Sequence, residues 1–156
     1  MRYILSEFCC LILLILSLLT KCRFIVRGNS MLPRYNDADK FIINRFTYFY
    51  SHPKRGDIVC FKANWGLEKI YLKRIVGLPG ESIKSTGKNI YINDKILHED
   101  YVITIHLEDS PNASIWTLGN SEYFVLGDNR ATNFDSRRFG PITKKDLIGP
   151  TYHKCF

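Results

Sequence analysis

The feature that constrains this chain most is an almost purely apolar segment at its N-terminus. Residues 3–20 contain a single charged side chain, Glu7, and are dominated by Leu and Ile. A helix that crosses a bilayer needs about 20 apolar residues, whereas a cleavable signal peptide has a shorter apolar core followed by a small-x-small site. No such site follows residue 20. We therefore predict a retained transmembrane anchor over residues 1–22, with removal of the segment as the alternative.

The charge balance points to an anionic partner. The chain has 22 Lys and Arg against 15 Asp and Glu, a formal net charge of +7, which suits either a lipid leaflet or a nucleic acid. The apolar segment favours the lipid. Lys21, Arg23 and Arg27 follow the segment and only Arg2 precedes it, so the positive-inside rule alone would leave the rest of the chain in the cytoplasm.

The remainder, residues 23–156, has the pattern of one mainly β domain. Residues 144–148 are the one candidate for a helix, and residues 85–120 form a more polar excursion. The predicted fold class is mainly β, an antiparallel β-sheet body with one N-terminal transmembrane helix. Short apolar and β-branched runs predict strands at 23–27, 39–44, 57–62, 69–76 and 123–126 and a hairpin at 89–97.

Two polar residues are candidates for catalysis. Ser30 lies in the bend 28–33, between a Gly and a Pro, and Lys73 lies inside the apolar run 71–77. A free lysine has a pKa of about 10.4, but burial can lower it to roughly 6, and a neutral lysine can take the proton of a serine hydroxyl. By itself Lys73 would be interpreted as an exposed strand residue, since most lysines are exposed. The serine on its bend reverses that preference.

Other catalytic and metal chemistries have less support. The five cysteines and four histidines show no spacing typical of a metal site. None of the histidines lies in a motif that would make it the base for a serine or a cysteine. We expect no metal and no organic cofactor.

Three motifs follow the apolar segment in a characteristic order. They are Ser-Met-Leu-Pro at 30–33, Lys-Arg-Ile-Val-Gly-Leu-Pro-Gly-Glu at 73–81, and a polar stretch at 127–141 that contains Gly-Asp-Asn-Arg, Asp-Ser-Arg and Phe-Gly-Pro. Together they resemble the successive boxes of type I signal peptidases, which are membrane-anchored serine endopeptidases and include the mitochondrial inner-membrane peptidases. One box alone is a weak signal, but three in order over roughly residues 20–150 are a strong one. The resemblance implies a signal-peptidase-like β body.

The resemblance assigns roles to the two candidate residues. Ser30 would be the nucleophile and Lys73 the general base, with the backbone N–H of Ser30 holding the oxyanion. Some family members add a serine hydroxyl two residues before the nucleophile, where this chain has Gly28. The family also commonly places a serine that hydrogen-bonds the lysine where this chain has Asn133, whose amide oxygen could take that role.

The resemblance also implies a supporting shell and a substrate. Salt-bridged residues would form a scaffold under the site, with Ser136 as a further hydroxyl near the lysine. Shallow apolar pockets would accept small side chains of a signal sequence, cleaved after a small residue with another small residue two positions earlier. The predicted scaffold residues are Arg74, Asp128, Asp135 and Arg137, and the predicted pocket residues are Phe24, Val26 and Leu72.

The resemblance further predicts location and partners. The partners would be precursor proteins with signal peptides and membrane lipids, with no nucleic acid expected. The catalytic body would face the outer side of a bacterial plasma membrane as a single-pass protein, with the mitochondrial inner membrane as the alternative. We prefer this topology to the flanking-charge count, because a folded domain can be translocated regardless of a few charges.

Two alternative functions remain at this stage. One is a dedicated maturation protease of the same family that processes one particular precursor. The other is a non-catalytic basic β module that binds a membrane or single-stranded nucleic acid. In that second case Ser30 and Lys73 would be dispensable and the basic residues should gather on one face, whereas they are spread along the chain among Asp and Glu.

Overall fold

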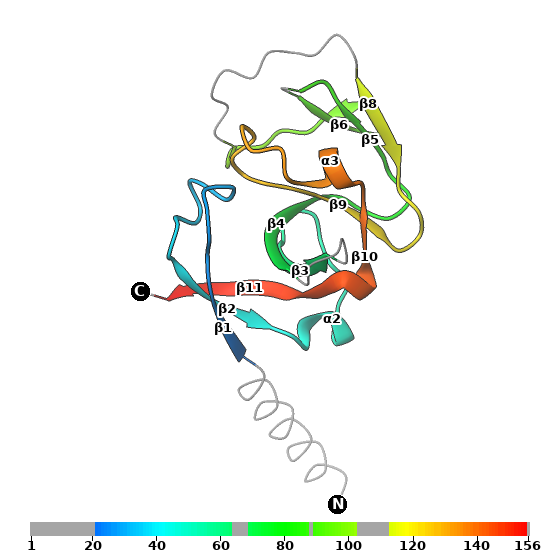
Figure 1. The fold of residues 1–156 in the computed structure, drawn as a ribbon. Helices are drawn as coiled ribbons and strands as arrows, with labels where there is room; N and C mark the ends of the chain where they lie inside the picture. Colours follow the sequence, from blue (N-terminus) through cyan, green and yellow to red (C-terminus); the bar gives the residue numbers. More distant parts are fainter. Residues whose placement is uncertain (1–20, 64–68, 88, 103–112, 156) are drawn as a thin grey trace, which may run out of the picture.

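The computed structural model describes residues 21–63, 69–87, 89–102 and 113–155, and it contains two antiparallel sheets (Figure 1). The predicted anchor lies almost wholly outside these residues. Within the described ranges, the structure has no helix with the length and apolar character needed to cross a bilayer.

The larger sheet has seven strands in the order β1-β2-β11-β3-β4-β9-β10. Every neighbouring pair in it is antiparallel. Its strands are β1 (Lys21–Ile25), β2 (Lys40–Asn44), β3 (Ile58–Ala63), β4 (Lys69–Gly77), β9 (Glu122–Leu126), β10 (Ile142–Thr143) and β11 (Leu147–Cys155).

The smaller sheet comes from the stretch between β4 and β9 (Figure 1). Its strands, in spatial order, are β7 (Lys95–Ile96), β6 (Ile90–Ile92), β5 (Ser82–Ser85) and β8 (Ser114–Thr117). The β6–β7 hairpin turns at Asn93 and Asp94, whose φ values of 49° and 64° are left-handed, as a two-residue turn requires. The predicted hairpin is therefore confirmed.

Helix is confined to single turns. They are α2 (Thr47–Tyr50), α3 (Ser136–Phe139) and the 3₁₀ turn η1 (Lys144–Asp146). The candidate helix at 144–148 is wrong beyond this turn, because Leu147 has an extended backbone and begins β11. The prediction of a mainly antiparallel β body is confirmed for the described residues.

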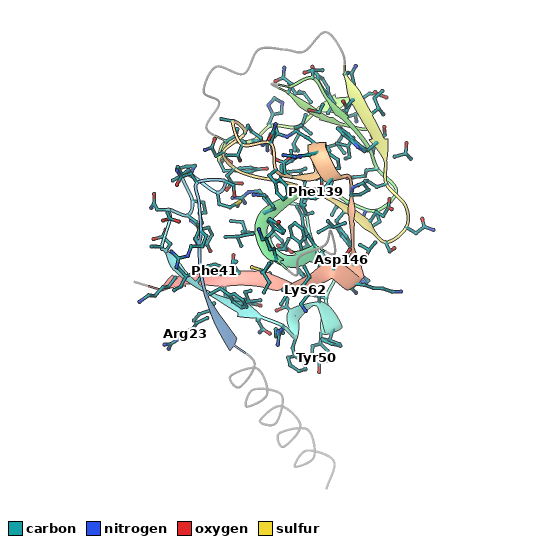
Figure 2. All side chains as sticks on the ribbon, viewed as in Figure 1. Arg23, Phe41, Tyr50, Lys62, Phe139 and Asp146 are labelled. Carbon is teal, nitrogen blue, oxygen red and sulfur yellow. The ribbon has the colours of Figure 1, made fainter. Side chains whose placement is uncertain are left out.

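Strand β4 lies where three parts of the hydrophobic core meet. Leu72 packs against a cluster around Val26 and Phe41, Ile75 belongs to a second cluster, and Val76 belongs to a third. Figure 2 shows the side chains that fill the space between the strands, with Phe41 and Phe139 labelled. The second half of β4, from Lys73 to Gly77, is largely buried, so a polar residue there is removed from water.

Candidate active site

Ser30 lies in the bend that connects β1 to β2. The next residue, Met31, is 1 % exposed, and its carbonyl accepts a hydrogen bond from the N–H of Tyr35 at 2.9 Å. The Ser30 carbonyl accepts from the N–H of Asn129 at 3.1 Å. The bend is thus fixed by the core on one side and by the loop after β9 on the other, while the serine itself stays partly exposed.

Lys73 lies on β4, opposite Val59 of β3, and is 4 % exposed. Its Nζ is 2.6 Å from Oγ of Ser30. In the part of the chain that the structure describes, this hydroxyl is the hydrogen-bond partner of the amine. The fold therefore brings together the two residues that the sequence singled out, although 43 positions separate them.

The surroundings of Lys73 favour its neutral form. Burial lowers its pKa to about 8, an effect that Asp135 and Asp128 oppose and Arg137 reinforces. Desolvation acts in this direction because it penalises the charged ammonium. About a tenth of the amine is therefore unprotonated at pH 7, far more than for a free lysine, and this form can accept the proton of the adjacent hydroxyl.

Two of the predicted scaffold residues, Arg74 and Asp128, form an ion pair, and Arg74 directly follows Lys73 on β4. Arg74 Nε and Nη2 donate to the two carboxylate oxygens of Asp128 at 2.7 and 2.6 Å, and Nη1 donates to the carbonyl of Gly56 at 2.8 Å. Asp128 is fully buried. This two-bond geometry is strong and directional, so it fixes the residue that follows Lys73 on β4.

The other two predicted scaffold residues form a second ion pair, which closes the loop after β9. Arg137 Nε and Nη2 donate to the carboxylate of Asp135 at 2.9 and 2.7 Å, and the same arginine donates to the carbonyls of Arg130 and Thr132. Asp135 also caps α3 and accepts from the N–H of Gly127 at 3.3 Å. The loop is held as a compact hydrogen-bonded shell.

Two other predicted residues have different neighbours from those expected. The hydroxyl of Ser136 accepts from the N–H of Val125 at 2.9 Å, so it supports β9 instead of the lysine. The side chain of Asn133 is exposed, and among the described residues it makes no hydrogen bond with Lys73. No side chain of this loop hydrogen-bonds the amine where the structure describes it.

A hollow of about 200 Å³ opens beside the serine. The three predicted pocket residues, Phe24, Val26 and Leu72, line it together with Ser30 and Lys73. Ile25, between Phe24 and Val26 in the sequence, also lines the hollow. The lining residues that the sequence did not predict are Arg27, Met31, Phe41, Cys60, Ile70 and Tyr71.

The position of Gly28 has a conformational explanation. Its φ is 83°, in the left-handed region that side chains disfavour, and its N–H donates to Asp37 Oδ1 at 2.7 Å. A serine at this position would be strained in the present backbone. The backbone of this bend therefore favours glycine at position 28.

Three residues near the site had not been assigned from the sequence. Arg130 and Glu99 form a buried ion pair, with Arg130 Nη2 at 2.5 Å from Glu99 Oε1. The centroid of the Tyr101 ring lies 3.9 Å from Arg74 Cζ. Arg130 belongs to the third motif, which could have signalled it. Glu99 and Tyr101 lie in the polar excursion and carry no local signal.

Comparison with known proteins places this site in a family. Residues 1–155 match the signal peptidase family, peptidase S26. The chain is 35 % identical over 137 residues to signal peptidase I V of Bacillus subtilis, covering 80 % of this chain and 79 % of that protein. It is 30 % identical over 141 residues to signal peptidase IB of Staphylococcus aureus, covering 81 % and 73 %.

A solved structure agrees with these matches. The crystal structure of a signal peptidase I from Enterococcus faecalis superposes with a TM-score of 0.55 at 31 % identity, covering 64 % of this chain and 97 % of that one. Sequence and fold point to the same family, which sets aside the non-catalytic binding module. The chain belongs to the type I signal peptidases of the peptidase S26 family and is a serine endopeptidase that removes signal peptides.

Proposed function

We propose that Ser30 and Lys73 perform this cleavage as a Ser-Lys dyad. The observation that carries the proposal is the 2.6 Å separation between Lys73 Nζ and Ser30 Oγ. The amine is buried, and burial lowers its pKa to about 8, so a base next to the nucleophile is available near neutral pH.

The reaction proceeds in two halves. Neutral Lys73 takes the proton of the Ser30 hydroxyl as Oγ attacks the scissile carbonyl, and the resulting ammonium returns the proton to the leaving amine. Water then attacks the acyl-enzyme with the lysine again acting as base. In the described ranges the N–H of Ser30 has no acceptor, which leaves it as the donor for the oxyanion.

The hollow beside Ser30 accounts for a small-residue preference. The rings of Phe24 and Phe41 stack within it at 5.9 Å, and the side chains of Val26 and Leu72 complete an apolar lining. The small side chains at the cleavage site and two residues earlier fit such a shallow space. Because β1 is the edge strand of the larger sheet, an extended signal sequence can pair with it through main-chain hydrogen bonds.

The membrane arrangement is part of the same proposal. The anchor predicted over residues 1–22 has to end at residue 20, because Lys21 and Cys22 belong to β1 and pair with β2. The rest of the chain is a catalytic domain on the outer face of a bacterial plasma membrane. Bacterial relatives favour this location over the mitochondrial inner membrane. The turn α2 lies at the end of the body where β1 begins (Figure 1), with Tyr50 labelled in Figure 2. Its residues Phe49 and Tyr50 are 78 % and 74 % exposed. Aromatic rings are favoured at a membrane interface, and membrane lipids are the expected partners there.

The test uses the detergent-solubilised full chain and a precursor with an alanine-x-alanine site. We expect cleavage after the second alanine, established by sequencing the product N-terminus. Ser30→Ala and Lys73→Ala should remove activity while both proteins stay folded, and Lys84→Ala serves as the matched lysine control. Cleavage by Lys73→Ala at the parent rate would contradict the dyad.

The range of substrates separates a general enzyme from a dedicated one. A panel of unrelated precursors, each with small residues at the two recognised positions, should be cut at comparable rates by a general signal peptidase. Cleavage of a single member of the panel would instead support a maturation protease for one precursor.

A further inference from the structure

The buried carboxylate of Glu99 accepts hydrogen bonds from two residues, Arg130 and Tyr101, and a series of contacts leads from each of them toward Ser30 or Lys73. Glu99 follows β7, its side chain is 7 % exposed, and its Oε1 accepts from Arg130 Nη2 at 2.5 Å. The same oxygen accepts from the hydroxyl of Tyr101 at 2.5 Å. Hydrogen bonds to a buried charge are short and strongly ordering. Glu99 and Tyr101 therefore form one ordered unit on the excursion that carries the smaller sheet.

The first series of contacts runs from this unit to the lysine. The ring of Tyr101 lies 3.9 Å from Cζ of Arg74, close enough for the guanidinium to be attracted to the ring face. Burial and the hydrogen bond with Glu99 raise the pKa of Tyr101, so the phenol stays neutral and remains a donor. Arg74 holds Asp128 with its other groups, and it directly follows Lys73 on β4.

The second series of contacts runs from Glu99 to the serine. Arg130 Nε donates to the carbonyl of Gly127 at 3.0 Å. Gly127 packs closely on the nucleophile's backbone, since a Cβ at this position would lie 2.5 Å from the carbonyl oxygen of Ser30. This second series of contacts thus ends at Gly127, which lies directly against the main chain of Ser30.

We propose that Glu99 and Tyr101 are positioning residues that brace both halves of the dyad at once. Tyr101 holds Arg74 behind Lys73, and Glu99 holds Arg130 behind the serine. The inference rests on the proposed function, because it takes these two residues as the reacting pair. A displacement of about 1 Å between reacting groups can cost about a hundredfold in rate, so a brace common to both has a direct effect on turnover.

The contacts of Glu99 and Tyr101, which we call the brace, also affect the pKa of Lys73. Arg74 neutralises the charge of Asp128, and without Tyr101 it would be held less firmly against that carboxylate. Asp128 would then act more strongly on Lys73 and raise its pKa. The acid limb of the kcat/KM profile should move to higher pH. The charged groups that act on the lysine are Asp135, Asp128 and Arg137.

The experiment compares two tyrosines in the detergent-solubilised full chain. Tyr101→Leu removes the ring beneath Arg74. Tyr91→Leu is the matched control, because Tyr91 also lies beneath a cation, 5.6 Å from Lys84 Nζ on the smaller sheet. For Tyr101→Leu we expect kcat to fall about tenfold or more with KM within about twofold, and the acid limb to rise by about half a pH unit or more. Tyr91→Leu should keep the parent values.

Two conservative variants keep the inference testable if Tyr101→Leu fails to fold. Tyr101→Phe keeps the ring and loses only the hydroxyl, so its fall in kcat should be smaller. Glu99→Gln keeps the shape but cannot neutralise Arg130, and it should lower kcat per folded molecule with KM unchanged. If Glu99→Gln and the foldable Tyr101 variants keep the parent kcat and pH profile, the brace is refuted whatever their melting temperatures.

Ser30→Ala in the same assay separates the two proposals. An active Ser30→Ala protein would refute the dyad itself. An inactive Ser30→Ala protein beside parent-like variants of Glu99 and Tyr101 would refute only the brace.

Discussion

Lys73 and Lys84 both lie on β-strands, but their surroundings differ. Lys73 on β4 is 4 % exposed and contacts a serine hydroxyl. Lys84 on β5 is only half-buried and lies over the ring of Tyr91, its cross-strand partner. Residue type and secondary structure are the same in both places. Burial among the packed strands of the larger sheet lowers the pKa of Lys73, whereas the smaller sheet leaves Lys84 partly in contact with water.

The largest expected effect is the loss of stability when the ion pair of Arg74 with the buried Asp128 is broken. Arg74→Met should destabilise the protein by about 3–5 kcal/mol, because it leaves the fully buried carboxylate of Asp128 unpaired. The comparison pair is Arg55 and Glu81, whose side chains are 30 % and 17 % exposed. Arg55→Met should cost about 1 kcal/mol or less. Chemical denaturation of both variants measures the difference, and equal losses would contradict the role assigned to burial.

The second effect is the loss of folding stability caused by burial of the Lys73 amine. The unfolded chain binds more protons than the folded chain between pH 8 and 10.5, because folding lowers the pKa of Lys73 from 10.5 to about 8. Stability of the parent should therefore rise with pH across that window. Lys73→Met should be more stable than the parent by about 2–3 kcal/mol below pH 8, with the gain gone by pH 10.5.

Lys84→Met is the control for that measurement. It should show no comparable gain at any pH in the window, because its lysine is only half-buried. Denaturant midpoints recorded from pH 6 to 11 would test both variants. A destabilised Lys73→Met protein at pH 7 would mean that burial of the amine carries no cost.

The third effect concerns the rate. In the proposed mechanism the active form has a neutral Lys73, and burial lowers the pKa of this amine to about 8. We therefore expect kcat/KM to rise about tenfold per pH unit below pH 8 and to level off above it. Lys84→Met should follow the same curve, whereas a parent profile that is flat from pH 6 to 9 would exclude a titrating lysine as the base.

The smallest effect is expected at the loop position where relatives commonly carry a serine. The side chain of Asn133 is exposed, and a serine on the same backbone would face solvent too. Asn133→Ser should change kcat/KM by about twofold or less and leave the pH midpoint unchanged. A shift of that midpoint would show that this side chain reaches the lysine during the reaction.

The proximity of Ser30 and Lys73 could be predicted because its signals are local. Ser30 and Lys73 each lie in a short motif, and the ordered motifs predicted that they belong together. The same motifs predicted a salt-bridged scaffold of Arg74, Asp128, Asp135 and Arg137, and the structure shows how these residues pair. Glu99 and Tyr101 could not be found this way, since their partners are distant in sequence and their own segment has only a polar composition.

The missed strands also have a physical cause. β11 contains Gly149 and Pro150, which are typical of turns, yet it is an interior strand of the larger sheet. Its ladder shifts register near both ends, between Leu147 and Gly149 and between Thr151 and His153, and such irregularities accommodate a proline without an N–H. The strands β5, β8 and β10 are four residues or shorter, too short for a clear alternation.

The place of β11 has a consequence for the biosynthesis of the enzyme. This strand is near the end of the chain, but it lies between β2 and β3 and is the ladder that joins the β1–β2 hairpin to the rest of the larger sheet. The bend within this hairpin carries Ser30, and β4, beyond β3, carries Lys73. A growing chain therefore completes the larger sheet, and brings the two proposed catalytic residues together, only after β11 has been synthesised.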